Sequence, residues 1–305
     1  MGGGVTFSAT PAVKLKPQVY IAKGSSPWYT SDDYWKDKDK VISTNESVSG
    51  QATVTCNGNV TDMGDMFYDC KKLTSLDLSN FDTSNVTNMS EMFYHCSILT
   101  KLDLSNFDTS NVTDMNGMFG WCYKFTLLDL SNFDTSNVTD MSWMFISCTN
   151  LTSIDLSSFD TSNVTDMNGM FSGGYKFTSL DVSKFNTSNV TDMYAMFRYC
   201  GFTSLDLSNF DTSNVTDMGD MFYDCEKLTS LDLSNFDTSN VTDMGEMFNK
   251  CYNLTTIKGV IDMKSCKDYA DMFNGCTKLT GVKIKNPPSG FNGAGLSSSQ
   301  YTIVS

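Results

Sequence analysis

Cysteine is the first residue type in this chain whose regular spacing could support chemistry. Of the ten cysteines, eight recur at nearly constant intervals: Cys70, Cys96, Cys122, Cys148, Cys200, Cys225, Cys251 and Cys276. Thiolates bind metals or form disulfides, but no pair has the short spacing typical of metal sites. We therefore expect a column of buried, reduced thiols that pack as small apolar side chains, with Cys56 and Cys266 outside it.

Aspartate is the second such residue type, and its spacing raises the question of glycoside hydrolysis. Seven aspartates share one repeat position: Asp77, Asp103, Asp129, Asp155, Asp181, Asp206 and Asp232. Retaining glycosidases use two nearby carboxyls in different environments, one of them kept protonated, and seven equivalent side chains do not provide that difference. We interpret them as a solvated acidic ladder, with loosely held cations as an alternative role. Mutual repulsion should raise some of their pKa values.

No other constellation predicts catalysis, a cofactor or a metal site. His95 is the single histidine, and it stands at a variable position, so no Ser–His–Asp or Cys–His pairing is suggested. The net charge of −14, from 21 basic and 35 acidic residues, opposes binding to nucleic acid. No apolar run is long enough to span a bilayer, and the N-terminal region lacks the pattern of a secretory signal.

An internal repeat organises all of these residues. Phenylalanines mark one position of the repeat, and their residue numbers differ by 26, 26, 26, 26, 25 and 26: Phe81, Phe107, Phe133, Phe159, Phe185, Phe210 and Phe236. Self-similarity at such a period predicts a solenoid whose repeats are stacked rungs. The short interval lacks one residue between Cys200 and Phe202, which indicates a loop there.

The first half of each repeat predicts a short strand. Leu73, Leu76 and Leu78 follow the spacing L-x-x-L-x-L, so that the leucines point inward while Asp77 and its serine neighbours point outward. Equivalent strands would pair in a parallel sheet about 4.8 Å apart. Leu102, in the next repeat, should then be fully buried. A repeated asparagine is expected to form a ladder that satisfies backbone groups: Asn85, Asn111, Asn137, Asn163, Asn189, Asn214 and Asn240.

The second half of each repeat predicts a short helix. Met89, Met92, Phe93 and Cys96 stand at i, i+3, i+4 and i+7, which is one apolar stripe over two helical turns. The Asn or Asp before each stripe could cap that helix. Neighbouring helices about 8–10 Å apart would keep the cysteines too far apart for disulfides. The expected fold is an α/β solenoid, leucine-rich-repeat-like, with a parallel sheet on one face and short helices on the other.

Three regions follow from this organisation. Residues 1–50 form a non-repeat N-terminal segment, interpreted as a cap or an attachment site for a larger assembly. Residues 51–285 form a repeat solenoid of about eight to nine rungs. Residues 286–305 form a C-terminal cap or tail, which begins with Asn286 and two prolines that stop the pattern.

The motifs NVTDM, MF-x-x-C and LTSLDLSNFDTS resemble the BspA-like bacterial surface repeats of 26 residues, which also occur in phage-encoded proteins. The resemblance covers about residues 58–280. It implies a leucine-rich-repeat-like fold and a role in adhesion or surface recognition. The chain departs from this family in having no visible secretion signal or wall-sorting motif. It departs from the ordinary leucine-rich consensus in having Phe81 where that pattern has Asn or Cys.

Variation between repeats provides the candidate binding residues. The outward strand positions are nearly constant, whereas the positions between and after the methionines differ in every copy and include many aromatic residues. The partner-binding candidates are Tyr68, Tyr94, Trp121, Trp143, Tyr194, Arg198, Tyr199 and Tyr223. Tyr, Trp and Arg dominate interface hot spots, although relaxed constraint on a solvated face would also produce variation.

These observations leave three hypotheses about function. The favoured one is a non-enzymatic recognition or adhesion module, extracellular or at the cell surface, that binds a protein or a cell-surface glycan. The alternative is a phage virion component, such as a fibre, tail or decoration protein attached through residues 1–50. The remote alternative is an enzyme that acts on polysaccharides.

Overall fold

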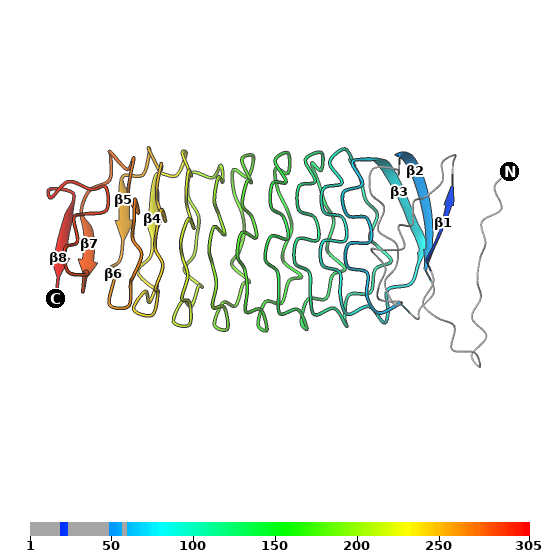
Figure 1. Cartoon of the computed structure of the whole chain (residues 1–305), viewed down its shortest axis with the longest axis horizontal. Coiled ribbons are helices and arrows are strands. Elements are labelled where there is room, and N and C mark those ends of the chain that lie inside the picture. The colour runs from blue at the N-terminus through cyan, green and yellow to red at the C-terminus, as the bar shows by residue number, and fades with distance from the viewer. Residues whose placement is uncertain (1–18, 24–48, 57–59) are drawn as a thin grey trace. The chain divides into compact units, whose positions relative to one another are not determined.

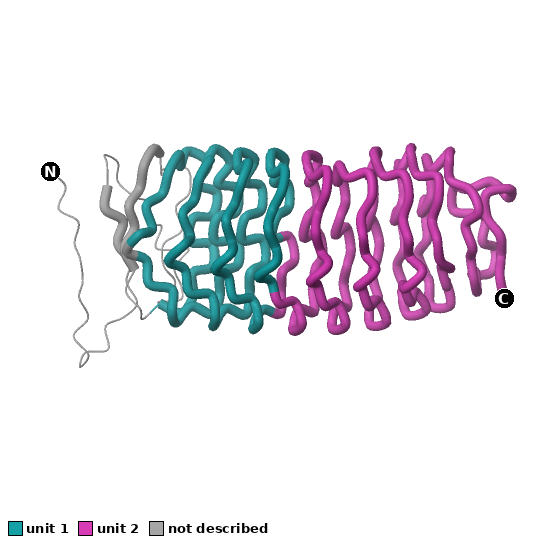
Figure 2. The backbone as a smooth tube through the Cα atoms, turned by 180° about the vertical axis from the view of Figure 1, so that it is seen from behind, with its two compact units in different colours: residues 1–138, 144–159 teal, residues 139–143, 160–305 magenta. Residues whose placement is uncertain are grey.

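The computed structural model describes residues 19–23, 49–56 and 60–305, with side chains described from residue 60 onward except at Asn80. The chain divides into two compact units: residues 1–138 with 144–159, and residues 139–143 with 160–305 (Figure 2). The predicted cap or attachment role of residues 1–50 lies outside the described residues, except for the backbone of two strand segments. The boundaries of the three predicted regions remain predictions.

Eight strands are present in the described residues (Figure 1). In the first unit, β1 (Val19–Lys23) pairs antiparallel with β2 (Ser49–Cys56), which pairs in parallel with β3 (Lys72–Phe81). In the second unit, β4 (Ser230–Asp232) pairs in parallel with β5 (Thr256–Lys258). A further parallel sheet has the order β6 (Ile261–Asp262), β7 (Val282–Lys285) and β8 (Tyr301–Val304).

The repeats stack as rungs within each unit (Figure 1). Their buried apolar columns form the core. Met92 and Phe93 are both 0% exposed, as the repeat predicts. The rings of Phe67 and Phe93 stack in the first unit with centroids 5.4 Å apart, and those of Phe222 and Phe248 stack in the second at 5.6 Å. Each buried phenylalanine contributes about 1.5–3 kcal/mol through removal of apolar surface from water. The columns therefore supply most of the driving force for stacking.

The prediction of a helix in each repeat is wrong, because the described residues contain only strands, turns and bends. The segment M-x-x-M-F-x-x-C, called here the turn segment, is a series of tight turns. Met66 N–H donates to Met63 O at 3.3 Å, whereas Asp65 N–H donates to Ser90 O, in the next rung, at 2.9 Å. Asp65 and Asp69 have φ of 58° and 59°, which no α-helix contains. Alternate N–H groups therefore link neighbouring rungs instead of closing helical turns.

The caps predicted for those helices are instead the first residues of turns. Asp62 Oδ1 accepts a hydrogen bond from Gly64 N–H at 2.9 Å, which is the geometry of an aspartate-initiated turn. Gly219 N–H and Asp217 Oδ1 make the same contact in the second unit, also at 2.9 Å. The Asp or Asn before each apolar stripe therefore does begin a local structure, but that structure is a turn segment and not a helix.

The predicted strands are present in only some of the rungs. Strands β3 and β4 coincide with the L-x-x-L-x-L pattern, whereas the equivalent residues 125–133 are not a strand. Burial still alternates there: Leu128 and Leu130 are 3% and 1% exposed, and Asp129 points outward. Leu102 is only half-buried, so the prediction of its full burial is wrong. The leucines at the same repeat position in the rungs on either side, Leu76 and Leu128, are 8% and 3% exposed, so Leu102 occupies an inward position that is covered less completely than theirs.

Side-chain ladders connect the rungs where strand pairing is absent. Asn111 Nδ2 donates to Ser84 O at 2.9 Å in the first unit, and Asn240 Nδ2 donates to Ser213 O at 2.8 Å in the second. This confirms the predicted asparagine ladder. A second ladder was not predicted: Asn106 Nδ2 donates to Leu78 O at 2.9 Å and to Phe81 O at 3.0 Å. Each such bond contributes about 1 kcal/mol and joins a backbone carbonyl of one rung to a side chain of the next.

Candidate functional site

The cysteine column is structural. The nine cysteines with described side chains are buried and form no disulfide, as predicted. Cys96 Sγ donates to Phe67 O at 3.2 Å, and Cys200 Sγ donates to Phe171 O at 3.2 Å. Burial raises the pKa of the Cys148 and Cys200 thiols to about 12, so both stay protonated and unreactive at neutral pH. No group of three metal-binding side chains occurs among the described residues.

The reason given for the absence of disulfides needs correction, because there are no helices to space the cysteines. Neighbouring rungs are close enough for backbone hydrogen bonds. Equivalent side chains in such rungs point in the same direction, whereas a disulfide requires a dihedral angle near 90° about its S–S bond. The parallel orientation of the cysteine side chains, and not a large distance between them, therefore disfavours a disulfide between neighbouring rungs.

The outward aspartates are called here the outer aspartate ladder, and their titration differs from the prediction. Hydrogen bonds from serine two residues later lower the pKa of five of them: Asp103, Asp129, Asp181, Asp206 and Asp232. In one rung, Ser105 Oγ and N–H donate to Asp103 Oδ1 at 2.7 and 3.0 Å. The expectation of raised pKa values is wrong because these local donors outweigh repulsion between solvated carboxylates.

A second column, the inner aspartate ladder, was missed as a titrating group. It consists of the Asp of each NVTDM motif together with Asp268 at the equivalent position, and in the second unit its members are Asp140, Asp166, Asp192, Asp217, Asp243 and Asp268. Burial, with repulsion from neighbouring carboxylates, raises the pKa of Asp166 and Asp217, and raises that of Asp192 to about 6. These three residues begin turn segments and are half-buried there, and the raised pKa values follow from that partial burial.

The candidate partner-binding residues of the first unit lie together on the turn face. This name denotes the surface made by the side chains between the methionines, after Met-Phe and after Cys. Tyr68 and Tyr94 stack with ring centroids 5.3 Å apart. The rings of Trp121 and His95 pack in a T-shaped arrangement with centroids 5.7 Å apart. His95 Nδ1 lies 2.8 Å from Asp69 Oδ1.

Four candidates of the second unit also form one cluster on the turn face. The Arg198 guanidinium lies over the rings of Tyr199 and Tyr223, 4.8 and 4.6 Å from their centroids. Arg198 also pairs with Asp220 at 3.5 Å, and Tyr194 Oη donates to Asp220 Oδ2 at 2.7 Å. Tyr223 is only 8% exposed, so its ring mainly supports Arg198.

Trp143, the eighth candidate, has a different neighbour. Its ring covers Gly169 in the next rung, where an added Cβ would lie 2.7 Å from Trp143 Cε3. Gly169 is therefore the residue that makes room for the indole. None of the contacts described for Arg198, Tyr199 and Tyr223 involves Trp143.

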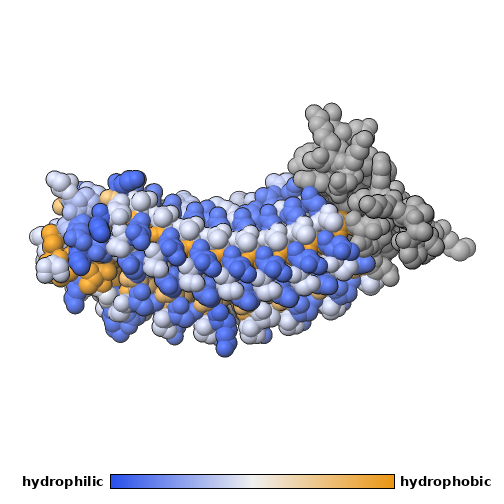
Figure 3. Space-filling model, turned by 90° about the horizontal axis from the view of Figure 1, so that it is seen from below, coloured by the Kyte–Doolittle hydropathy of each residue, from blue (hydrophilic) through white to orange (hydrophobic). Residues whose placement is uncertain are grey.

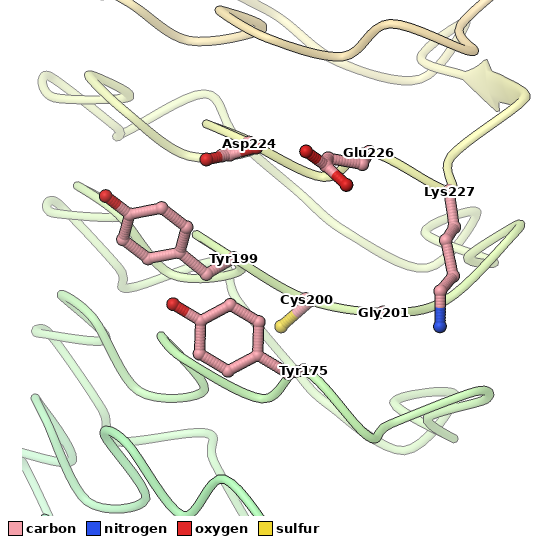
Figure 4. Close-up of a pocket in the computed structure, with 7 residues that line it drawn as sticks. All are labelled: Tyr175, Tyr199, Cys200, Gly201, Asp224, Glu226 and Lys227. Carbon is pink, nitrogen blue, oxygen red and sulfur yellow. The ribbon is translucent and has the colours of Figure 1, made fainter.

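A pocket of about 200 Å³ opens beside the second-unit cluster (Figure 4). It is lined by Tyr175, Tyr199, Cys200, Gly201, Asp224, Glu226 and Lys227. The rings of Tyr175 and Tyr199 stack with centroids 5.7 Å apart and form one side, with the Lys227 side chain across from them (Figure 4). Among the predicted candidates only Tyr199 lines this pocket. The 25-residue interval between Phe185 and Phe210 could have predicted the position of this pocket, because the missing residue lies next to Gly201.

The strand face, made by the outer aspartates and their serine neighbours, offers no comparable variety. Its side chains repeat from rung to rung. Figure 3 shows a face of the molecule where hydrophilic residues dominate and apolar residues appear mainly as a narrow line between polar rows. One exception is Leu127, which is 70% exposed beside the outer ladder.

Comparison with solved structures finds repeat proteins. The chain is similar to a leucine-rich repeat protein from Bacteroides ovatus, with 14% identity, 87% of this chain and 88% of that chain covered, and a TM-score of 0.34. A leucine-rich cell surface protein from Faecalibacterium prausnitzii matches with 15% identity, coverage of 79% and 67%, and a TM-score of 0.30. The functional domain of InlJ from Listeria monocytogenes, described as including a cysteine ladder, matches with 15% identity, coverage of 75% and 59%, and a TM-score of 0.19.

Three further findings accompany these comparisons. No curated protein matches the sequence. Within the part of the chain that the structure describes, no helix is long and apolar enough to cross a membrane. A family model does match, over residues 40–128, 122–204 and 180–286, which together cover most of the chain. The chain belongs to this family, which is described as Mycoplasma protein of unknown function, DUF285.

Proposed function

We propose that this chain is a non-enzymatic recognition module that binds a protein or a glycan through its turn face. The observation that carries the proposal is the clustering of unlike side chains there: Tyr199, Arg198 and Asp220 meet within one unit, beside a pocket. Aromatic and arginine side chains in such clusters supply most of the energy of specific interfaces. An extracellular or cell-surface location is part of the same proposal.

The titration of the outer aspartate ladder argues against hydrolysis by these carboxyls. A glycosidase needs one carboxyl with a raised pKa to protonate its leaving group. The pKa values of Asp129 and Asp206 are instead lowered, and both side chains are exposed. They stay ionised at neutral pH, as members of a solvated ladder would. The virion alternative stays a prediction, since no contact among the described residues bears on it.

The proposal is tested with the intact chain and two matched double variants. Trp121→Ala with Tyr199→Ala removes one turn-face aromatic from each unit, and Asp129→Asn with Asp206→Asn removes one strand-face charge from each unit. The labelled proteins are applied to an array of oligosaccharides and to an array of peptides. Loss of an aromatic anchor commonly costs about 2–4 kcal/mol of binding energy. A single ladder aspartate should cost little, because equivalent neighbours remain.

We expect the intact chain to bind one class of ligand, the turn-face variant to lose that binding and the strand-face variant to keep it. Circular dichroism must show that both variants are folded. Mass spectrometry of any bound oligosaccharide after incubation should detect no cleavage. Binding lost only in the strand-face variant, cleavage of a ligand, or no binding on either array would each overturn the proposal.

A further inference from the structure

The pocket arises from the single irregularity in the spacing of the repeat. In other rungs two residues separate the column cysteine from the next core residue, as Glu226 and Lys227 do after Cys225, but only Gly201 separates Cys200 from Phe202. The position after the column cysteine therefore reads Tyr175, Gly201 and Glu226 in three successive rungs of the second unit. Gly201 has no side chain, and the residue that would follow it in a regular rung is missing.

The hollow cannot be filled by a larger residue at Gly201. An added Cβ would lie 2.1 Å from the backbone oxygen of Tyr175, and real Cβ atoms do not approach backbone that closely. Tyr175 of the preceding rung and Tyr199 of the same rung border the space on one side, and Asp224 and Glu226 of the following rung border it on the other. The repeat thus builds a permanent opening between two walls of different chemistry.

Size limits what this opening can hold. Its volume of about 200 Å³ lies below the roughly 300–1,000 Å³ of sites for drug-sized molecules. It corresponds to about six or seven water molecules at roughly 30 Å³ each. One small ring or one side chain can enter, whereas a larger ligand would extend out over the neighbouring rungs.

Charge favours a neutral occupant. Asp224 and Glu226 contribute two negative charges to the rim, and Lys227 contributes one positive charge. Nearby Lys250, which interacts electrostatically with Asp224, contributes a second positive charge, so the sum is zero. Arg198 adds no net charge because it pairs with Asp220. An incoming cation would also compete with the Arg198 guanidinium, which already lies 4.8 Å from the centroid of Tyr199. An incoming anion would meet both carboxylates. A ligand with a full charge of either sign therefore gains little here.

The hydrogen-bonding groups match hydroxyls. The carboxylates of Asp224 and Glu226 accept hydrogen bonds, the Lys227 ammonium donates them, and the tyrosine hydroxyls do both. A sugar hydroxyl is at once donor and acceptor, so it can use all three kinds of group. The Tyr175 ring is 52% exposed and offers a flat apolar surface to the C–H face of a pyranose.

From this combination we infer that the pocket between Tyr175 and Glu226 binds one neutral pyranose ring of a glycan chain. The inference rests on the proposed function and assigns the ligand class for one part of the turn face. The rest of the glycan would extend across the neighbouring rungs. The ring would pack on Tyr175 while its hydroxyls bind Glu226, Asp224 and Lys227.

The test uses the intact chain and an array of immobilised neutral, sialylated and sulfated oligosaccharides, followed by calorimetric titration with the neutral oligosaccharide that binds best. Tyr175→Ala should weaken binding by at least about tenfold, as expected for loss of an aromatic anchor. Glu226→Gln removes a charged acceptor and should also weaken it. The matched control is Tyr252→Ala, which removes a 43% exposed tyrosine from the same repeat position outside the pocket. The control should bind as the parent does.

The outcomes separate this inference from the proposed function. Binding of only sialylated or sulfated oligosaccharides, or of none, overturns the neutral-sugar assignment. Neutral binding that survives both Tyr175→Ala and Glu226→Gln overturns the pocket assignment. Binding of lysine- or arginine-containing peptides alone overturns the inference, whereas the recognition proposal survives if that binding is lost with Trp121→Ala and Tyr199→Ala. Thermal unfolding of each variant must match the parent for any loss to count.

Discussion

The thiol of Cys96 donates a hydrogen bond to the carbonyl oxygen of Phe67, one rung earlier, with an Sγ–O distance of 3.2 Å. The same oxygen accepts the N–H of Cys70 at 3.2 Å. Equivalent bonds join Cys122 to Phe93 and Cys148 to Phe119, each at 3.1 Å. The column is therefore a series of connections between rungs, in addition to its role as apolar filling.

The first prediction concerns the reactivity of these thiols. A thiol reagent acts on the thiolate, and burial raises the pKa of Cys148 to about 12. We expect the column cysteines to stay unmodified in native protein and all ten cysteines of the chain to react after unfolding in guanidinium chloride. Peptide mapping by mass spectrometry measures each site. Rapid native labelling of Cys96, Cys122 or Cys148 would contradict their burial.

The second prediction concerns pH and the inner aspartate ladder. The pKa of folded Asp192 is raised to about 6, from an ordinary value of 3.8, chiefly by burial. The folded state then binds more protons than the unfolded state between these values, so this carboxyl makes the protein less stable as pH rises from about 4 to 6. Asp192→Asn should raise the free energy of unfolding at pH 7 by about 1 kcal/mol, after discounting for partial exposure. Near pH 4 the gain should be small.

The first unit already contains the arrangement that this substitution would create. Asn88 occupies the equivalent position, accepts Ser90 N–H at 2.8 Å and donates through Nδ2 to Asp62 Oδ1 at 3.0 Å. The control is Asp206→Asn in the outer ladder, whose pKa is lowered by Ser208 and which should give no gain at pH 7. Urea unfolding of both variants at pH 4 and pH 7 measures the difference. A gain for Asp192→Asn that is equal at both pH values would exclude titration as its cause.

The third prediction distinguishes turns from the helix that the sequence suggested. Ser147 has φ of 54°, and Gly173 and Gly275 occupy the same repeat position with φ of 79° and 87°. Glycine in the middle of a helix costs about 1 kcal/mol, whereas at positive φ it relieves a strain of roughly 1–2 kcal/mol. Ser147→Gly should therefore leave the free energy of unfolding unchanged or raise it, and Ser147→Val should lower it by about 2 kcal/mol. A loss for Ser147→Gly would support a helix.

How far the sequence predicted the fold depends on what its patterns can distinguish. The column positions of Met92 and Phe93 were predicted correctly because any rung must bury them. The helix was not, because spacing i, i+3, i+4 and i+7 points inward both in a helix and in successive four-residue turns. Gly117 and Gly169, both at positive φ, are the residues that favour turns. The sequence alone does not show that these glycines adopt positive φ, because hydrophobic periodicity does not specify backbone dihedral angles.

The candidate site was predicted less completely, for two physical reasons. Arg198, Tyr199 and Tyr223 meet because they stand in adjacent rungs, which the repeat made foreseeable. The pocket exists because one residue is missing after Gly201. The repeat pattern predicts where side chains lie, but it does not predict the empty space that such a deletion leaves. The predicted direction of the pKa shift in the outer aspartate ladder was also wrong. The hydrogen bonds donated by Ser105 and its equivalents act over shorter distances than the repulsion between carboxylates of neighbouring rungs.

The fourth prediction concerns Gly201 itself. In Gly201→Ala the new Cβ would lie 2.1 Å from Tyr175 O, which is backbone and cannot rotate away. Overpacking of this kind costs about 1–3 kcal/mol, so the free energy of unfolding should fall by roughly that amount. Gly245→Ala is the control, because its nearest neighbour is a flexible oxygen of Asp243 at 3.2 Å. Equal losses in the two variants, measured by urea unfolding, would contradict the close approach at Gly201.

The last prediction tests whether the irregular spacing is the source of the pocket. Inserting one lysine between Gly201 and Phe202 restores the two-residue spacing that follows Cys225, and the 26-residue interval with it. Because regular rungs satisfy their own core and ladders, the insertion should leave the protein folded and its melting temperature within a few degrees of the parent. The added side chain would occupy the space between Lys227 and the tyrosine wall, so binding of the neutral oligosaccharide should fall by at least about tenfold. The control is a lysine inserted at the same place in a regular rung of the first unit, between Lys124 and Phe125, where no residue lines the pocket, and it should leave sugar binding unchanged. Undiminished sugar binding in the folded Gly201–Phe202 insertion variant would show that the missing residue does not create the site.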